Sequence, residues 1–200
     1  MTRIGVLGGT FDPPHYGHLI LAEQAWEQLA LSRVLWVPAG NPPHKQDELV
    51  TPVEHRLTLV RLAIADNPRF ELSLVDARRE GPDYSYAMLA IIAAEHPGDE
   101  LVFLIGEDSL RDLPTWKNPE KLIEVAQLGV MRRRDVVYDI GQLEAAIPGL
   151  VGCLSFIDTP LVDISSEMIR DHLAKGRSVR YQTPDGVIQY VHQHRLYQNN

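Results

Sequence analysis

Short apolar runs alternate with longer segments of helical periodicity along most of this chain. The apolar runs are predicted to be β-strands and cover residues 4–7, 34–37, 70–75, 101–105, 129–131 and 154–157. The segments around them are predicted to be α-helices at residues 15–29, 53–64, 84–95, from 118, 139–147, 165–175 and from 183. This alternation predicts an α/β fold, in which a doubly wound parallel sheet carries helices on both faces.

The length and composition of the chain limit the number of domains that it can form. Two hundred residues, 44% of them hydrophobic, are enough for one well-packed domain. No repeat, low-complexity segment or linker divides the sequence, so residues 1–200 are predicted to form a single domain. The helix at 53–64 follows Thr-Pro-Val-Glu at 51–54, which is typical of a capping box with proline at the first helical position.

The turn after the first predicted strand carries the most informative residues. Positions 8–18 are Gly-Gly-Thr-Phe-Asp-Pro-Pro-His-Tyr-Gly-His. Gly8 and Gly9 are expected to let the backbone turn sharply beside a ligand, and the two prolines delay the helix until about His15. Because His15 and His18 are three residues apart, they share one face of the first helical turn. Imidazole donors and helix N–H groups together predict an anion site suited to a phosphate chain.

Two alternatives compete with this interpretation of the turn. A single histidine would favour an ordinary βα turn with a surface imidazole, but the combined pattern disfavours that explanation. A nicotinamide-dependent dehydrogenase is also disfavoured, because the glycines do not form the G-x-G-x-x-G fingerprint.

Charge and cysteine content narrow the class of protein. The formal net charge of −8 argues against a general nucleic-acid binder, which would carry a basic stripe. No apolar run approaches the roughly 20 residues of a membrane-spanning helix, and no signal peptide is expected. A single cysteine and the lack of a cluster at zinc spacing argue against a protein-held metal. We therefore expect a cytoplasmic protein that binds neither nucleic acid nor a membrane.

Further candidate residues follow a strand near the middle of the chain. Asp108, two residues after Gly106, is placed to accept hydrogen bonds from ribose hydroxyls. Trp116, in a turn beside a proline, offers a flat face to a ring. A helix cap for Asp108 and a hydrophobic cover for Trp116 explain these residues equally well.

The segment at 164–170, Ile-Ser-Ser-Glu-Met-Ile-Arg, begins a predicted helix. Ser165 is a candidate N-cap, and capping accounts for it alone. With Ser166 beside it and Arg170 one turn on, the combination favours phosphate binding. Lys45, which ends a proline-rich loop, and Arg133, in a run of three arginines, are weaker candidates. An ordinary surface loop and a solvated charged face are their respective alternatives.

Residues 8–18 resemble the nucleotidyltransferase signature G-x-F-D-P-x-H-x-G-H, which small adenylyl- and cytidylyltransferases share and which is related to a motif of class I aminoacyl-tRNA synthetases. Over nearly its whole length the chain resembles the bacterial nicotinate-nucleotide adenylyltransferase family. The further matches are Pro-Pro-His-Lys ending at Lys45, His55-Arg56, Gly106-x-Asp108, Leu-Pro-x-Trp ending at Trp116, the Ile-Ser-Ser motif, and Tyr190 with His194 to Tyr197.

The resemblance implies a Rossmann-like fold and adenylyl transfer from ATP to nicotinate mononucleotide, a step of NAD biosynthesis that gives deamido-NAD and pyrophosphate. His15 and His18 would be catalytic. The implied ATP site comprises Gly8, Gly9, Thr10, Phe11, His15, His18, Gly106, Asp108, Ser165, Ser166 and Arg170. The implied nicotinate mononucleotide site comprises Lys45, Ser85, Trp116 and Arg133. Mg²⁺ is expected to travel with ATP, and the resemblance leaves a homo-oligomer open.

The chain departs from the family pattern in three places. Ser85 follows Tyr84 where the family usually has threonine, so Ser85 is expected to supply the hydroxyl that seats the pyridine carboxylate. Arg134 and Asp135 replace the usual proline and glycine. Glu167 places an anion beside the polyphosphate.

Other functions remain in competition. The nearest competitor is another adenylyltransferase of the superfamily, such as one acting on phosphopantetheine or on nicotinamide mononucleotide. The enzyme acting on phosphopantetheine typically lacks the Pro-Pro-His-Lys loop and the Leu-Pro-x-Trp segment, so both segments count against it. A non-catalytic nucleotide sensor is disfavoured because both histidines and Arg170 are present. The acidic charge opposes an RNA-binding relative of the synthetases.

Overall fold

A computed structural model describes residues 2–41, 50–79, 81, 83–133, 136–160 and 162–198. Within these residues, six strands form a parallel sheet in the order β3-β2-β1-β4-β5-β6. The strands are β1 (Arg3–Gly9), β2 (Arg33–Pro38), β3 (Phe70–Leu72), β4 (Glu100–Gly106), β5 (Ala126–Met131) and β6 (Leu154–Ile157). The strand order reverses between β1 and β4, as in doubly wound Rossmann-like sheets. The predicted α/β fold is confirmed.

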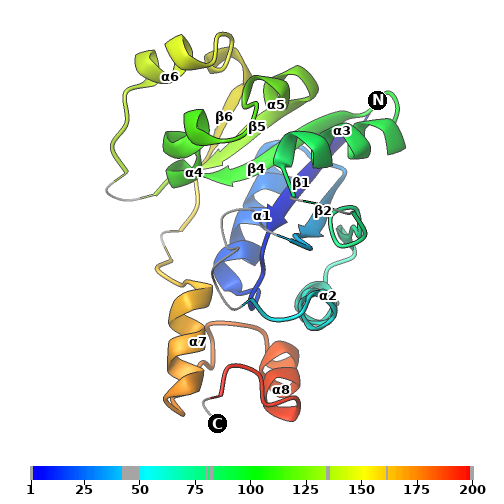
Figure 1. Ribbon diagram of the computed structural model, residues 1–200, viewed down its shortest axis with the longest axis vertical. Helices are drawn as coiled ribbons and strands as arrows, with labels where there is room; N and C mark the ends of the chain where they lie inside the picture. The colour runs from blue at the N-terminus through cyan, green and yellow to red at the C-terminus, as the bar shows by residue number, and fades with distance from the viewer. Residues whose placement is uncertain are drawn as a thin grey trace.

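Helices cover both faces of the sheet (Figure 1). Each face has its own apolar core, with Trp36 buried in one and Phe103 in the other. The first core is covered by α1 (Tyr16–Gln28), α2 (Val53–Ile64), α7 (Ser166–Ala174) and α8 (Asp185–Gln193). The second is covered by α3 (Ser85–Glu95), α4 (Glu107–Asp112), α5 (Glu120–Val125) and α6 (Ile140–Ala146). In the part of the chain that is described, no helix is long and apolar enough to cross a membrane.

The C-terminal helices α7 and α8 lie together below the sheet in Figure 1, and α8 packs against α2. Both helices are amphipathic and bury apolar side chains, which include Ile169 and Leu173 of α7 and Val187 and Val191 of α8. This packing brings residues from the end of the sequence close to the loop that follows β1.

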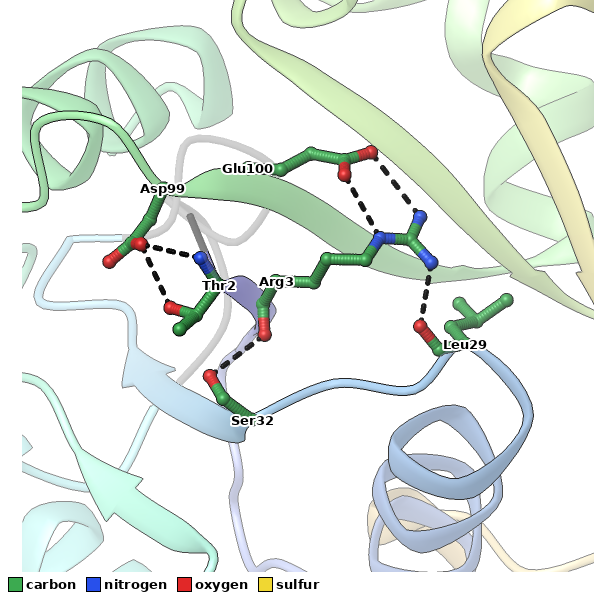
Figure 2. A network of polar contacts seen from close by, with 6 residues as sticks. All are labelled: Thr2, Arg3, Leu29, Ser32, Asp99 and Glu100. Atoms are coloured by element: carbon green, nitrogen blue, oxygen red, sulfur yellow. Dashed lines mark hydrogen bonds and ion pairs between the residues drawn. The ribbon is translucent and has the colours of Figure 1, made fainter.

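A polar network ties the strands together at their amino ends (Figure 2). The backbone N–H and the hydroxyl of Thr2 both donate to Asp99 Oδ1, at 2.9 and 2.8 Å. Arg3 Nε pairs with Glu100 Oε2 at 3.0 Å, and the Ser32 hydroxyl donates to the Arg3 carbonyl at 2.9 Å. These contacts fix β1 between its neighbours at the end of the sheet away from the carboxyl ends of the strands.

Most predicted elements lie within a few residues of the observed ones, and the exceptions have local causes. β3 ends at Leu72, three residues before the predicted end. The six-residue helix α4 was not predicted, because it is too short for a periodic pattern.

The expected glycine turn at Gly8 and Gly9 is wrong. Both residues continue β1 and pair with Val37 and Pro38 of β2. The backbone instead adopts a positive φ of 51° at Phe11. The ladder with β2 therefore extends to the last glycine, and the chain changes direction two residues later than expected.

The predicted capping box before α2 is also wrong. Pro52 is the N-cap, and no side chain caps this helix. Thr51 instead donates its N–H to Asp12 Oδ2 at 3.2 Å, and its carbonyl accepts from Arg56 Nε at 2.8 Å. One long-range bond, to Asp12, and one bond to a side chain of α2 itself therefore replace the capping pattern.

Candidate active site

A cleft of about 900 Å³ opens at the carboxyl ends of β1 and β4, where the strand order reverses. The predicted site residues that line it are Gly8, Gly9, Thr10, His15, His18, Ser85, Gly106, Trp116, Arg133, Ser165, Ser166 and Arg170. The side chains of Phe11 and Asp108 are not part of this lining, and Lys45 lies outside the described residues. The structure therefore gathers candidates from distant parts of the sequence around one cleft.

His15 and His18 form a stacked pair at the start of α1. Their ring centroids are 3.7 Å apart, and the His15 backbone N–H donates to His18 Nδ1 at 3.2 Å. Because Nδ1 accepts this bond, a neutral His18 carries its proton on Nε2. Gly17 makes room for the pair, since a Cβ there would come within 3.0 Å of the His15 ring.

Burial keeps both imidazoles neutral. Burial, with a smaller contribution from Arg133, lowers the pKa of His15 to about 4. Burial also lowers the pKa of His18 well below its usual value, and the nearby His15 and Arg133 add to the effect. At pH 7 each ring is an uncharged donor with one N–H. The fixed positive charge at this end of the cleft comes from arginines.

Phe11 contacts His18 from the core and is only 2% exposed. The two rings meet edge to face with their centroids 5.1 Å apart, and Phe11 in turn packs against Trp36 at 5.2 Å. Phe11 therefore supports the His18 ring from behind, and its side chain does not face the cleft.

Side chains from other elements hold the backbone of the loop at residues 10–14. Four of its carbonyl oxygens accept hydrogen bonds at 2.7–2.8 Å. The bonds join Thr10 to Arg56, Asp12 to Arg170, Pro13 to Ser166 and Pro14 to Thr183. The shape of this loop, and with it the position of the histidines, therefore depends on α2, α7 and the segment before α8.

The carboxylate of Asp12 is fixed in the same way. Its Oδ1 accepts from the Tyr197 hydroxyl at 2.6 Å, and its Oδ2 accepts from the Thr51 N–H. Burial and the neighbouring Asp12 raise the pKa of Tyr197 far above its usual value. The phenol therefore stays a donor at neutral pH and connects the C-terminal segment to the loop.

The amino end of α7 lies against the loop at residues 10–14 and lines the same cleft. Ser165 is its N-cap, as predicted, and its Oγ accepts from the Met168 N–H at 3.1 Å. The Ser166 hydroxyl already donates to the Pro13 carbonyl, so what Ser166 offers a ligand is its backbone N–H. Glu167, in the same first turn, also lines the cleft.

The segments that follow β4 and β5 contribute another part of the lining. Arg133 Nε pairs with Asp108 Oδ1 at 3.1 Å, and a Cβ on Gly106 would collide with both side chains. Buried Glu107 accepts from the Arg133 N–H at 2.8 Å and from the Tyr138 hydroxyl at 2.9 Å. Asp108 thus lies beside the lining with Arg133 as its partner.

Aromatic and apolar side chains line the part of the cleft near α3. Trp116 follows the 3-10 turn Leu113–Thr115 and meets Phe103 edge to face, with centroids 6.3 Å apart. Ser85 is the first residue of α3 and lies between Tyr84 and Tyr86, whose rings stack. A flat ring with a polar substituent fits this chemistry.

Comparison with known proteins identifies the family. The cytidylyltransferase-like family model matches residues 6–172. A probable nicotinate-nucleotide adenylyltransferase from Thermomicrobium roseum is 47% identical over 98% of this chain and 92% of its own length. One from Roseiflexus is 43% identical over 97% of both chains. The chain belongs to the nicotinate-nucleotide adenylyltransferase family. The family predicted from the sequence is confirmed.

Solved structures support the fold of this nicotinate-nucleotide adenylyltransferase family member. The nicotinic acid mononucleotide adenylyltransferase of Plasmodium falciparum, complexed with NaAD, has a TM-score of 0.79 at 21% identity and covers 98% of both chains. The same enzyme complexed with APC gives 0.78 at 20% identity and the same coverage.

Sequence reasoning assigned no role to four charged residues near the cleft. Nothing in the sequence distinguishes Glu107 from an exposed glutamate. Arg56 could have been noticed as a charged residue on the apolar face of α2, because it lies three residues from Val53 and four from Val60. Asp76 and Asp83 line the cleft and share Arg79, at 3.0 and 3.4 Å. Burial raises the pKa of Asp76 to about 6, and burial also raises the pKa of Asp83.

Proposed function

We propose that this cleft performs the reaction of its family, adenylyl transfer from ATP to nicotinate mononucleotide. The observation that carries the proposal is the neutral, stacked histidine pair, which lines the same cleft as the amino end of α7 and Arg170. Helix N–H groups, a guanidinium and imidazole donors gathered in one cleft suit a triphosphate. The relatives at 47% and 43% identity bear the name of this reaction.

The reaction forms one phosphorus–oxygen bond and breaks another. An oxygen of the 5′-phosphate of nicotinate mononucleotide attacks the α-phosphorus of ATP, and the bond from that phosphorus to the bridging oxygen breaks to release pyrophosphate. The attacking phosphate is already ionised at pH 7, so no general base is needed. Catalysis then consists of in-line positioning and stabilisation of the charge that develops on the phosphates.

His18 Nε2–H is assigned to the α-phosphate, because the bond from the His15 N–H to Nδ1 leaves Nε2 as the donor. His15 orients the phosphate chain beside it. Arg170, Ser165 and the N–H of Ser166 hold the leaving β- and γ-phosphates. A neutral donor gains strength as negative charge develops on the oxygen that it contacts.

The remaining residues bind the two nucleotides. On the ATP side, Gly8, Gly9, Thr10 and Gly106 shape the cleft, Phe11 acts through the His18 ring that it supports, and Asp108 accepts from the ribose. On the acceptor side, Trp116 stacks on the pyridine ring, Ser85 donates to its carboxylate, and Arg133 and Lys45 bind phosphate. All of these residues belong to one nucleotidyltransferase domain over 1–200.

A divalent cation accompanies ATP in this proposal, and we assign it as Mg²⁺. Within the described residues no group of three or more histidine, cysteine, aspartate or glutamate side chains could hold a metal ion. Such an ion would enter the cleft together with ATP, and phosphate oxygens and water would supply most of its ligands. When bound, it would neutralise part of the charge of the phosphates. Asp163 of the lining is a carboxylate that would face its water shell.

The decisive experiment is chromatographic product analysis with ATP and each of three acceptors: nicotinate mononucleotide, nicotinamide mononucleotide and phosphopantetheine. We expect deamido-NAD and pyrophosphate in equal amounts, with a higher kcat/KM for the acid than for the amide. The carboxylate gains charge-assisted hydrogen bonds from Ser85 and nearby N–H groups. Equal kcat/KM values would contradict the assigned acceptor, and no product with any acceptor would contradict adenylyl transfer.

A further inference from the structure

Arg56 is a buried arginine that lies outside the lining of the cleft. Its side chain comes from α2, and the residue is 1% exposed. Its guanidinium donates to three backbone carbonyls: from Nε to Thr51 at 2.8 Å, from Nη1 to Thr10 at 2.8 Å, and from Nη2 to Gly40 at 3.4 Å. These acceptors follow β1, follow β2 and precede α2, so one side chain connects three separate segments.

Two of these segments reach the cleft. Thr10 lines the cleft and begins the loop that leads to His15, and Ala39, which precedes Gly40, lines the cleft as well. Ala39 is also bonded directly to the end of β1, because its N–H donates to the Gly9 carbonyl at 2.9 Å. Arg56 therefore lies directly behind the wall from which the histidines project.

The burial of this charge needs an explanation. A buried guanidinium is costly unless hydrogen bonds replace its water, and an apolar residue at this helical position would extend the stripe of α2. The carboxylate oxygens of nearby Asp12 accept from Tyr197 and Thr51. The nearby Asp12 and Asp83 partly compensate the charge of Arg56, whereas its hydrogen bonds are made to carbonyl groups of the loops, so loop geometry is the property that these bonds control.

We propose that Arg56 is a positioning residue for adenylyl transfer, which sets the histidine pair against the α-phosphate by holding the Thr10 and Gly40 carbonyls. The proposal rests on the function proposed above. Arg56 touches neither substrate and acts through the loop. A shift of this loop would move His15 and His18 together, and a displacement of about 1 Å at reacting groups can cost as much as a hundredfold in rate.

The planar fork of arginine is needed for this arrangement. Its donors point in fixed, divergent directions and reach three carbonyls at once. A lysine ammonium is a single point at the end of a flexible stem, so it can keep the charge and one bond while it releases the other two segments. Arg56→Lys therefore separates the charge of this residue from its geometry.

The test compares Arg56→Lys with Val60→Ala. Val60 lies one turn further along α2, is fully buried in the core and does not line the cleft, so its truncation destabilises the same helix without touching the loop. Both variants and the wild type are assayed below their unfolding transitions, and kcat is expressed per folded molecule. We expect kcat to fall about tenfold to a hundredfold in Arg56→Lys, with little change in KM for ATP. Val60→Ala is expected to keep kcat within about twofold of wild type.

Arg56→Gln, which retains an uncharged donor, is measured in parallel in case the lysine variant does not fold. Equal kcat values for Arg56→Lys and Val60→Ala would overturn the proposal, as would a loss confined to KM. Failure of both Arg56 variants to fold would also overturn it, because Arg56 would then serve folding as a whole. Product formation by the wild type and Val60→Ala tests the proposed function separately from the role of Arg56.

Discussion

The lowered pKa of His15 predicts a specific dependence of stability on pH. Native His15 has a pKa of about 4, whereas an unfolded histidine titrates near 6.5. Between these values the unfolded chain binds more protons than the native protein, so stability rises with pH through this window and is lost as pH falls. Integrated from pH 7 to pH 5, the difference in pKa corresponds to a loss of about 2 kcal/mol.

A second buried group works in the opposite direction. Burial raises the pKa of Asp76 to about 6, so near pH 5 its carboxyl group is protonated in the native protein and mostly ionised in the unfolded chain. The contribution of Asp76 to the stability of the native protein therefore increases as pH falls toward 5. Because the pKa of His18 is lowered as well, the wild-type curve alone mixes the effects of His15, His18 and Asp76. His15→Asn isolates the effect of His15, because asparagine suits the N-cap position that His15 occupies in α1, and His18 and Asp76 are present in both proteins.

The assay is thermal or urea unfolding of wild type and His15→Asn at pH 7 and pH 5. We expect the wild type to lose about 2 kcal/mol more than the variant over this interval, which corresponds to about 4–8 °C in Tm for a chain of this length. His192→Asn, which replaces an exposed histidine of α8, is the control and is expected to follow the wild type. Parallel curves for wild type and His15→Asn would show that His15 is not held neutral by burial, and would refute the electrostatic description of the histidine pair.

Three further substitutions test the roles assigned in the cleft. His18→Ala should lower kcat by roughly 10²-fold, the scale of one lost preorganised donor, and a folded variant with near-normal kcat would remove His18 from the mechanism. Trp116→Ala should raise KM for nicotinate mononucleotide and leave KM for ATP nearly unchanged; equal effects on both would make Trp116 structural. Glu167→Thr should tighten ATP binding, measured by calorimetry, by about 0.2–1 kcal/mol, because it removes a screened repulsion, and it should slightly destabilise the free protein. Weaker ATP binding in this variant would point to a positive role for Glu167.

Local patterns in the sequence were enough to locate the strands and the larger helices, and the family resemblance named many of the residues that line the cleft. Short apolar runs and helical periodicity depend on neighbours within a few positions, which a sequence displays directly. The spacing of His15 and His18, together with the prolines before them, placed both imidazoles on the first turn of α1, and the structure has them there. The alternation of strands and helices was similarly sufficient to predict the sheet.

Tertiary structure decided the shape and the charge state of the site. The loop at 10–14 was expected to form through its own glycines and prolines, but its carbonyls are held by Arg56, Arg170, Ser166 and Thr183. Three of these donors lie more than 150 positions from their acceptors in the sequence, so no local pattern contains the bonds. The neutrality of the histidines arises likewise from burial, which depends on every element packed around them. The sequence alone therefore determined which chemical groups are present, and long-range packing determined where they point and which protons they carry.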